Sequence, residues 1–195
     1  NFYSIWYKEI EEDLKRGSNW RRERRYFEDM IDFQTLENIL SLLSQNNKTI
    51  LEIGSYDGYF IPHYKKFDKI ILADINEKSN LFPKDKKYSF YHLNGKNLNN
   101  IPSNSTDVAF SFDTFVRIDR QTLEKYFLDL VRIVTDKGYL IIHIPNIFHH
   151  NSLIMDYTNT SLFFYNRLLK KHSHRIIFDN QIHKLSTVLI CQIKK

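Results

Sequence analysis

Two short stretches carry residue types that suit the binding of a nucleoside. The segment Leu51–Gly58 (LEIGSYDG) leaves a buried apolar stretch and enters a turn with glycines at 54 and 58. Glycine at such a turn lets backbone N–H groups approach a ligand closely. Asp74 ends the next apolar stretch, twenty residues after Gly54, where a carboxylate can accept both hydroxyls of a ribose. Together these residues predict a site for a nucleoside-containing cofactor.

The residues around Gly54 narrow the kind of cofactor. A dinucleotide-binding loop has the pattern G-x-G-x-x-G, whereas the second and third glycine positions here hold Tyr56 and Tyr59. Glu52 stands two residues before Gly54, and its negative charge is unfavourable beside a pyrophosphate but favourable beside a cation. S-adenosylmethionine meets both conditions, because its sulfonium and ammonium groups are positive and it has no phosphate.

The elements that must position these residues change in character near residue 47. Before it, apolar residues recur at spacings of three and four and indicate helices. After it, helices over 119–134 and about 151–171 are predicted, and the segments 175–180 and 186–193 are expected to pair as an antiparallel hairpin. Buried strands are predicted at 49–54, 69–74, 88–93, 107–112 and 138–144.

Strands that alternate with helices form a parallel sheet covered on both faces. The predicted fold class is therefore α/β, a Rossmann-like doubly wound sheet of seven strands. The sheet is mostly parallel with a C-terminal antiparallel hairpin, and N-terminal helices precede it. Residues 1–46 are expected to form a helical lid or cap, and residues 47–195 a cofactor-binding domain. Such sheets bind ligands at the C-terminal ends of their strands, so the chemistry is expected there.

These segments resemble the class I S-adenosylmethionine-dependent methyltransferases. LEIGSYDG is similar to their first motif, E/D-x-G-x-G-x-G, with Tyr56 at the middle glycine, and Asp74 matches the acid after their second strand. The passages NGKNLNNIPSNSTDVAFSF (94–112) and RIVTDKGYLIIHIPN (132–146) resemble those that lead into their fourth and fifth strands. The resemblance implies that residues 47–195 form an S-adenosylmethionine-binding methyltransferase domain.

The resemblance also implies which residues contact the cofactor. In such enzymes the positions that match the first motif and Asp74 line the methionine and ribose part, while Asn97 and Leu98 would lie near adenine. The expected cofactor-binding residues are Glu52, Gly54, Ser55, Tyr56, Gly58, Asp74, Ile75, Asn97, Leu98 and Ser111.

Two side chains are candidates for the methyl-transfer step. Asp113 follows the fourth strand, where a carboxylate could act as a base or position the substrate, and a helix-cap or turn role is equally open. His143 could act as a base near neutral pH, although its alternation with apolar residues favours a buried, hydrogen-bonded sheet residue. Three further histidines, His172, His174 and His183, are expected on the surface or in the hairpin. A solvated helix face is expected to carry His63, Lys65 and Lys66.

The predicted function is methyl transfer to a small molecule, with S-adenosylhomocysteine as product and a sugar or other hydroxyl acceptor favoured. The fourth strand ends in Ser111–Thr114, which lacks the N/D-P-P-Y motif of enzymes that methylate adenine or cytosine amino groups. Two alternatives stay open. In the first, the acceptor is RNA or protein, and the supporting feature is a basic cluster in a chain of net charge +5, namely Arg21, Arg22, Arg24 and Arg25. Nucleic acid is a less favoured partner than a small molecule. The missing middle glycine favours an inactive interaction module.

Composition excludes several other classes of protein. The single cysteine, Cys191, excludes an internal disulfide and a cysteine-based zinc site, and the adjacent His149 and His150 point differently on any regular element. No metal site is therefore predicted. No apolar run approaches the ~18 residues of a membrane span, so no membrane partner is predicted and a cytoplasmic location is expected.

Overall fold

Alternating strands and helices make up most of the described chain. The computed structural model describes residues 31–56, 58–76, 85–146, 158–183 and 186–195. The helices in these ranges are α3 (Phe33–Ser44), α4 (Arg120–Ile133) and α6 (Leu162–Leu169), with short 3-10 helices η1 (Ile61–Tyr64) and η3 (Phe115–Arg117). The strands are β1 (Thr49–Ile53), β2 (Lys69–Asp74), β3 (Tyr88–His92), β4 (Thr106–Ser111), β5 (Val134–Ile144), β6 (Ser173–Asp179) and β7 (Thr187–Ile193).

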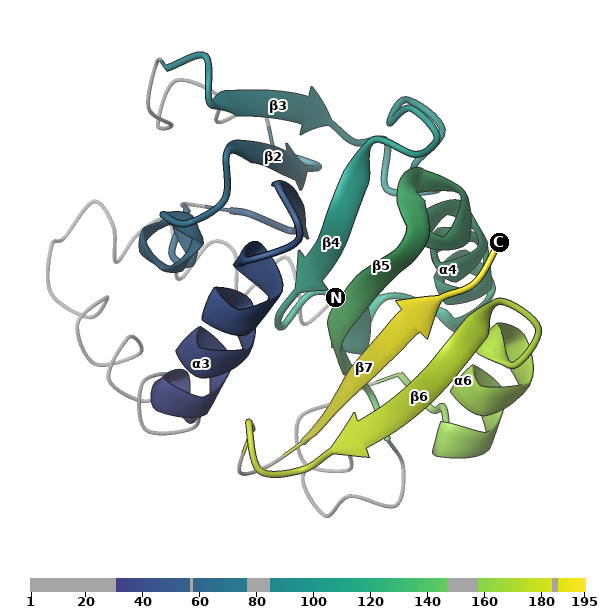
Figure 1. Cartoon of the computed structure of the whole chain (residues 1–195). Coiled ribbons are helices and arrows are strands. Elements are labelled where there is room, and N and C mark those ends of the chain that lie inside the picture. Colours follow the sequence, from purple (N-terminus) through teal and green to yellow (C-terminus); the bar gives the residue numbers. More distant parts are fainter. Residues whose placement is uncertain (1–30, 57, 77–84, 147–157, 184–185) are drawn as a thin grey trace, which may run out of the picture.

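The strands form one seven-stranded sheet in the order β3-β2-β1-β4-β5-β7-β6 (Figure 1). From β3 to β5 each neighbouring pair is parallel, whereas β7 is antiparallel to both β5 and β6. This arrangement confirms the predicted Rossmann-like sheet, mostly parallel with a C-terminal antiparallel hairpin. The order reverses between β1 and β4, which is where sheets of this kind bind ligands.

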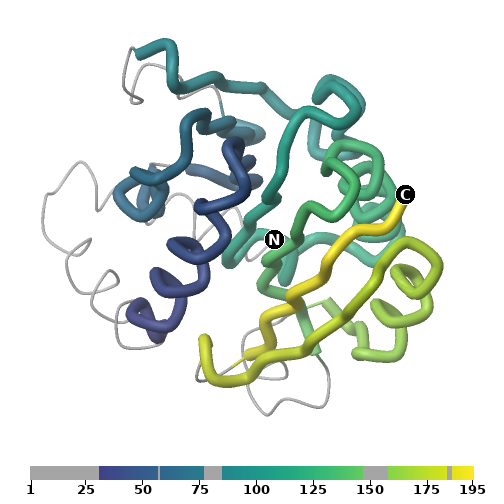
Figure 2. Tube along the Cα trace, viewed as in Figure 1, coloured from purple at the N-terminus to yellow at the C-terminus, as the bar shows by residue number. Residues whose placement is uncertain are grey.

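Helices cover both faces of the sheet. Successive side chains of a strand point to opposite faces, so Ile50 and Leu51 of β1 enter different cores. Leu51 packs in a core that α4 and α6 close, while Ile50 packs in a second core with α3 and η1. The trace in Figure 2 shows α3 on one side of the sheet and α4 and α6 on the other. Helices therefore pack on both faces of the central strands, and the C-terminal strand ends are the place where a sheet of this kind binds its ligand.

Two elements differ from their predicted bounds. β5 begins at Val134 rather than at 138, because Val134 already pairs with Thr106 before the register shifts and the strand continues. The helix predicted over 151–171 begins only at Leu162 within the described residues. The hydroxyl groups of Thr158 and Thr160 donate to the carbonyls of Ile118 and Pro145, and such bonds compete with a helix. Residues 151–157 lie outside the described ranges.

The predicted N-terminal lid falls largely on residues 1–30, which also lie outside the described ranges, together with the arginine cluster at 21–25. From residue 31 onward the chain joins the sheet domain. Ile31 bridges His183, the N–H of Asp32 donates to the carbonyl of Ile182, and Leu36 and Leu40 of α3 are buried. None of the described helices has both the length and the apolarity to cross a bilayer. A lid over residues 1–46 stays a prediction.

Candidate functional site

The C-terminal ends of β1, β2, β4 and β5 share one edge of the sheet, because these strands are parallel. The register fixes their alignment, with Ile53 opposite Ala73 and Ser111 opposite Ile142. The residues that follow each strand at this edge are those with polar chemistry. The candidate site is therefore built from the loop after β1, the carboxylate that ends β2, and the loop after β4.

Gly54 brings the loops after β1 and β4 into direct contact. Its φ is +79°, and its N–H donates to the carbonyl of Ala73 (2.8 Å). A Cβ added at this position would lie 1.8 Å from Thr114 Oγ1, so only glycine fits without displacing the β4 loop. Gly58 also has a left-handed backbone, and its N–H donates to the carbonyl of Ser55 (2.7 Å). The glycine turn predicted from the sequence is a tight loop packed on Thr114.

Tyr56, which stands where the resembling family has its middle glycine, adopts the backbone that a glycine would favour. Its φ is +39°, in the left-handed region that costs a non-glycine residue about 1–2 kcal/mol. The N–H of Tyr56 donates to Asp74 Oδ2 at 2.8 Å. This hydrogen bond ties the turn to the end of β2. The turn is therefore held to β2 although position 56 is not a glycine.

Asp74 is nearly buried, at 5% exposure, and anchors two segments at once. Besides Tyr56, it accepts from the N–H of Asn76 (2.8 Å) and from its Nδ2 (2.9 Å), both at Oδ1. A carboxylate offers about four acceptor positions, so Asp74 keeps capacity for a ligand hydroxyl. Ile75 beside it is 55% exposed, an apolar side chain at the mouth of the site.

Glu52 and Ser55 are both 2% exposed. Glu52 lies on the face that η1 covers. Burial, followed by the negative charge and hydrogen bonding of Glu52, raises the pKa of the Tyr64 phenol well above 10.0. Ser55 Oγ is buried and has no hydrogen-bond partner among the described residues. A ligand in the glycine turn would give this hydroxyl a partner.

The remaining cofactor candidates form hydrogen bonds with other residues of the protein. Ser111 is fully buried, and its Oγ donates to the carbonyl of Ile53 (2.7 Å), which locks β4 to β1. The Leu98 side chain is also fully buried, and its N–H donates to Asp129 Oδ2 (2.8 Å). Asn97 accepts at Oδ1 from the N–H of Asn99 (3.2 Å) in an exposed turn. The structure thus brings together the glycine turn, Asp74 and Ile75, while Leu98 and Ser111 face the protein interior.

Asp113 follows β4 in a strained backbone conformation, with φ +52°. Its side chain is 22% exposed, and Arg117 Nη2 lies 3.5 Å from Oδ2. Burial raises the pKa of the Asp113 carboxyl, and the Arg117 guanidinium opposes part of that rise. The N–H of Asp113 donates to His143 Nδ1 (3.2 Å). The two catalytic candidates are therefore in direct contact.

His143 is fully buried in β5, in agreement with the alternation of apolar residues around it. Its ring stacks on His183, with 4.5 Å between ring centroids. Burial, followed by the positive charges of His183 and Arg117, lowers the pKa of His143 well below 6.5. Because Nδ1 accepts from Asp113, the ring proton lies on Nε2. A neutral, buried imidazole of this kind holds the Asp113 backbone and does not face solvent.

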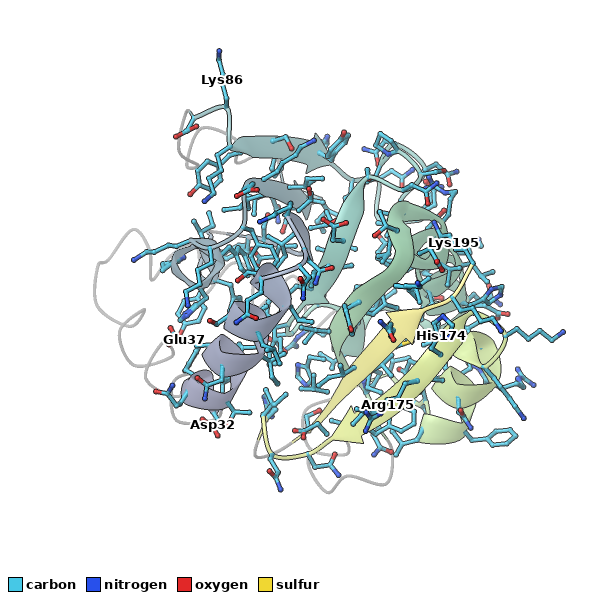
Figure 3. The ribbon with its side chains drawn as sticks, in the orientation of Figure 1. Asp32, Glu37, Lys86, His174, Arg175 and Lys195 are labelled. Atoms are coloured by element: carbon cyan, nitrogen blue, oxygen red, sulfur yellow. The ribbon has the colours of Figure 1, made fainter. Side chains whose placement is uncertain are left out.

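Two of the other histidines, one between the hairpin strands and one in a 3-10 helix, make contacts with distant parts of the chain. His183 is only 7% exposed, because the antiparallel pairing of β7 brings the preceding loop over His143. His63 lies in η1, where its Nδ1 contacts Glu37 Oε1 at 2.7 Å (Figure 3 labels Glu37 on α3). Lys65 and Lys66 after it are exposed. Neither histidine contact has a local sequence signal, since each joins residues far apart in the chain.

No protein-family model and no curated protein matches this sequence. Solved structures do match, and three methyltransferases among them share 12–14% sequence identity with this chain. The N-methyltransferase NodS of Bradyrhizobium japonicum, solved with S-adenosylhomocysteine, has a TM-score of 0.66 over 97% of each chain. An O-methyltransferase family protein of Burkholderia thailandensis has a TM-score of 0.65 over 94% of this chain. The CurJ carbon methyltransferase has a TM-score of 0.56 over 76% of this chain.

The matching proteins differ in how much of their length this chain covers. This chain covers 49% of the CurJ carbon methyltransferase and 63% of the Burkholderia protein, but 97% of NodS. The three are named as a carbon, an O- and an N-methyltransferase, so the feature that they share with this chain is the fold. The chain has the fold of the class I S-adenosylmethionine-dependent methyltransferases.

Proposed function

We propose that this protein is an S-adenosylmethionine-dependent methyltransferase that acts on a small molecule, with a hydroxyl acceptor favoured. One observation carries the proposal. The hydrogen bond from the Tyr56 N–H to Asp74 Oδ2 joins the glycine turn to the carboxylate that would bind a ribose, so the two form one site at the C-terminal ends of the strands. The fold of NodS, which was solved with S-adenosylhomocysteine, supports the same cofactor for this chain.

The residues present fit this cofactor. Gly54 lets the turn pack closely on Thr114, and the buried Ser55 Oγ in the same turn lacks a partner among the described residues. Asp74 would hold the ribose, and the exposed Ile75 offers an apolar contact for the adenine ring. When bound, S-adenosylmethionine supplies a methyl group on a positively charged sulfur. The negative charge of Glu52 favours such a cation over a pyrophosphate.

Asp113 is the group best placed to act on the acceptor. It follows β4 at the cofactor edge, and its partial burial raises the pKa of its carboxyl, which makes the carboxylate a stronger base. A hydroxyl acceptor must lose a proton as its oxygen is methylated, and Asp113 would take that proton. His143 holds the Asp113 backbone through its Nδ1, so we assign it a positioning role. A neutral amine acceptor would need no such base, which is why a hydroxyl is favoured.

Calorimetry with S-adenosylhomocysteine tests the cofactor assignment. Asp74→Asn keeps the size of the side chain but removes the charge, and we expect a loss of about ten- to a hundredfold in affinity, as for hydrogen bonds to a charged group. Asp68→Asn, just before β2 at its opposite end, is the matched control, because Asp68 is exposed and its one ion pair among the described residues is a 3.9 Å contact with Lys48. NADH should not bind. Absence of S-adenosylhomocysteine binding, or an unchanged affinity in Asp74→Asn, would sink the assignment.

A further inference from the structure

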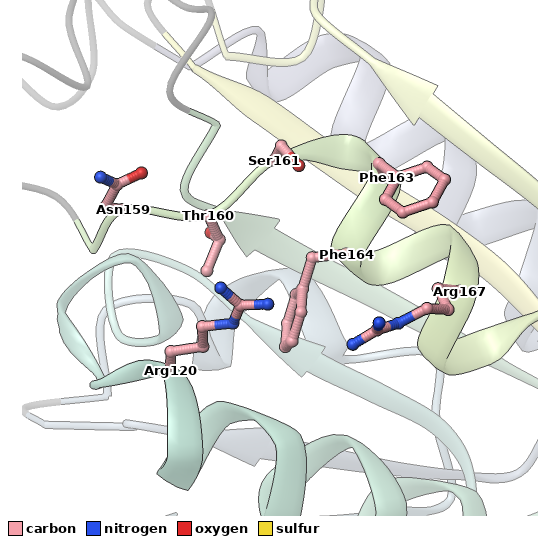
Figure 4. A pocket seen from close by; sticks show the side chains of 7 residues that line it. All are labelled: Arg120, Asn159, Thr160, Ser161, Phe163, Phe164 and Arg167. Atoms are coloured by element: carbon pink, nitrogen blue, oxygen red, sulfur yellow. The ribbon is translucent and has the colours of Figure 1, made fainter.

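A concave pocket of about 210 Å³ lies between the N-terminal ends of α4 and α6, outside the cofactor site (Figure 4). Arg120 contributes from the first turn of α4, and Phe164 and Arg167 from α6. Asn159 and the N-cap residue Ser161 complete the rim. A hollow of this size admits one small chemical group rather than a helix or a nucleic-acid duplex.

The charged side chains among the described lining residues of the pocket are both arginines. None of its described lining residues is acidic, and within the described ranges neither Arg120 nor Arg167 forms an ion pair with a carboxylate. In Figure 4 both side chains reach toward the Phe164 ring. The guanidinium carbon of Arg120 lies 5.0 Å from the centroid of that ring, an interaction that fixes its position. Two guanidinium groups in one hollow repel each other unless an anion lies between or beside them.

The start of α6 adds hydrogen-bond donors to the same hollow. Ser161 makes no capping hydrogen bond with its side chain to any described residue, so the first N–H groups of α6 are not capped by it. Arginine forks and free amide N–H groups are the donors that bind phosphate oxygens in proteins. Phe163, 74% exposed at the rim, offers an apolar surface to the rest of such a ligand.

The pocket is held next to the methyl-transfer edge. The N–H of Thr158 donates to the carbonyl of Val116 (2.9 Å), just after Asp113 in the chain. Thr160 Oγ1 donates to the carbonyl of Pro145 (3.1 Å) at the end of β5. The rim of the pocket is therefore attached to the loops that follow β4 and β5, the strands where the acceptor is expected.

We propose that this pocket binds a phosphate group carried by the small-molecule methyl acceptor. The phosphate would contact Arg120 and Arg167 while the rest of the molecule extends toward Asp113. That the phosphorylated molecule is the acceptor rests on the proposed function, whereas phosphate binding itself depends only on the pocket.

The test is calorimetry at low salt with inorganic phosphate, glucose 6-phosphate and unphosphorylated glucose as probes. We expect the two phosphate compounds to bind the full chain and glucose not to bind. Arg120→Gln and Arg167→Gln should each weaken phosphate binding about ten- to a hundredfold, as expected for charged hydrogen bonds. Arg175→Gln is the matched control, because Arg175 is exposed on β6 (Figure 3 labels it) and is not one of the pocket's lining residues. Its phosphate affinity should stay within about twofold of the wild type.

The outcomes separate this pocket from the proposed function. The proposed phosphate site would be rejected if neither phosphate compound bound the wild-type protein. It would also be rejected if Arg175→Gln weakened phosphate binding as much as Arg120→Gln and Arg167→Gln do. Binding of a single-stranded oligonucleotide without binding of glucose 6-phosphate would overturn the small-molecule ligand. S-adenosylhomocysteine affinity, measured on the same proteins, should not change in Arg120→Gln or Arg167→Gln. Phosphate binding without S-adenosylhomocysteine binding would retain the pocket and reject the methyltransferase.

Discussion

Replacing Gly54 by alanine tests how closely the loops after β1 and β4 approach. The new Cβ would lie 1.8 Å from Thr114 Oγ1 and 2.8 Å from Thr114 Cβ, so one of the loops must move. Overpacking of this kind costs about 1–3 kcal/mol. Gly54 also has φ +79°, and the left-handed backbone costs an alanine a further ~1–2 kcal/mol. We therefore expect Gly54→Ala to lower the free energy of unfolding by about 2–5 kcal/mol.

Gly95 provides a matched control for the backbone part of this cost. Its φ is +72°, close to that of Gly54, but the nearest described atom to a Cβ there is Ile75 Cγ2, at an ordinary 3.7 Å. Gly95→Ala should therefore cost only about 1–2 kcal/mol. Urea unfolding followed by circular dichroism measures both variants, and the difference between them isolates the contact with Thr114.

A second variant tests that contact directly. Adding Thr114→Gly to Gly54→Ala removes the atoms that the new Cβ would meet. The double variant should then be less stable than Thr114→Gly alone by no more than the loss that Gly95→Ala causes in the wild type. Equal losses in Gly54→Ala and Gly95→Ala, with no effect of position 114, would refute the close approach and with it the argument that Gly54 fixes the turn.

Three further substitutions probe the neighbouring side chains. Tyr56→Gly should exceed Tyr56→Val in free energy of unfolding by about 1–2 kcal/mol in urea titrations, because position 56 has φ +39°; equal stabilities would contradict the left-handed turn. Asp113→Asn should reduce turnover in a methyl-transfer assay far more than S-adenosylhomocysteine affinity, and unchanged turnover would remove its role as a base. The free energy of unfolding should decrease as the pH is lowered through about 6.5, because His143 stays neutral in the folded protein but gains a proton when unfolded. Urea unfolding at several pH values should show a smaller decrease in His143→Gln. The decrease should be unchanged in His174→Gln, because His174 is exposed on β6.

The sheet could be predicted from the sequence because its signals are local. Continuous apolar runs such as Ile70–Ala73 are long enough for a buried strand, and the polar residue that ends each run marks the sheet edge. The glycine turn and Asp74 were predicted for the same reason. Each depends on a residue type at a strand end, and the parallel register then places them together.

The contacts that complete the site join residues far apart in the chain. His183 reaches His143 only through the antiparallel register of β7, and Thr114 meets Gly54 only because β4 lies beside β1. The contact of Ser111 is also non-local. Its hydroxyl donates to the carbonyl of Ile53 on the neighbouring strand, and its role toward the cofactor stays a prediction. A sequence does not show whether a strand-end hydroxyl faces a ligand or its neighbouring strand.

Tyr56 bears directly on whether this chain is an inactive member of its fold. Loss of the middle glycine favours that interpretation only if the loop changed shape with it. The backbone at position 56 is left-handed, as a glycine there would readily be, at a cost of about 1–2 kcal/mol, and its N–H donates to Asp74. Strain of this kind is concentrated at sites that bind ligands, since elsewhere a relaxed loop would be more stable. The strained turn therefore argues for a working cofactor site, and S-adenosylhomocysteine calorimetry on Tyr56→Gly, expected to bind at least as well as the wild type, decides between the two.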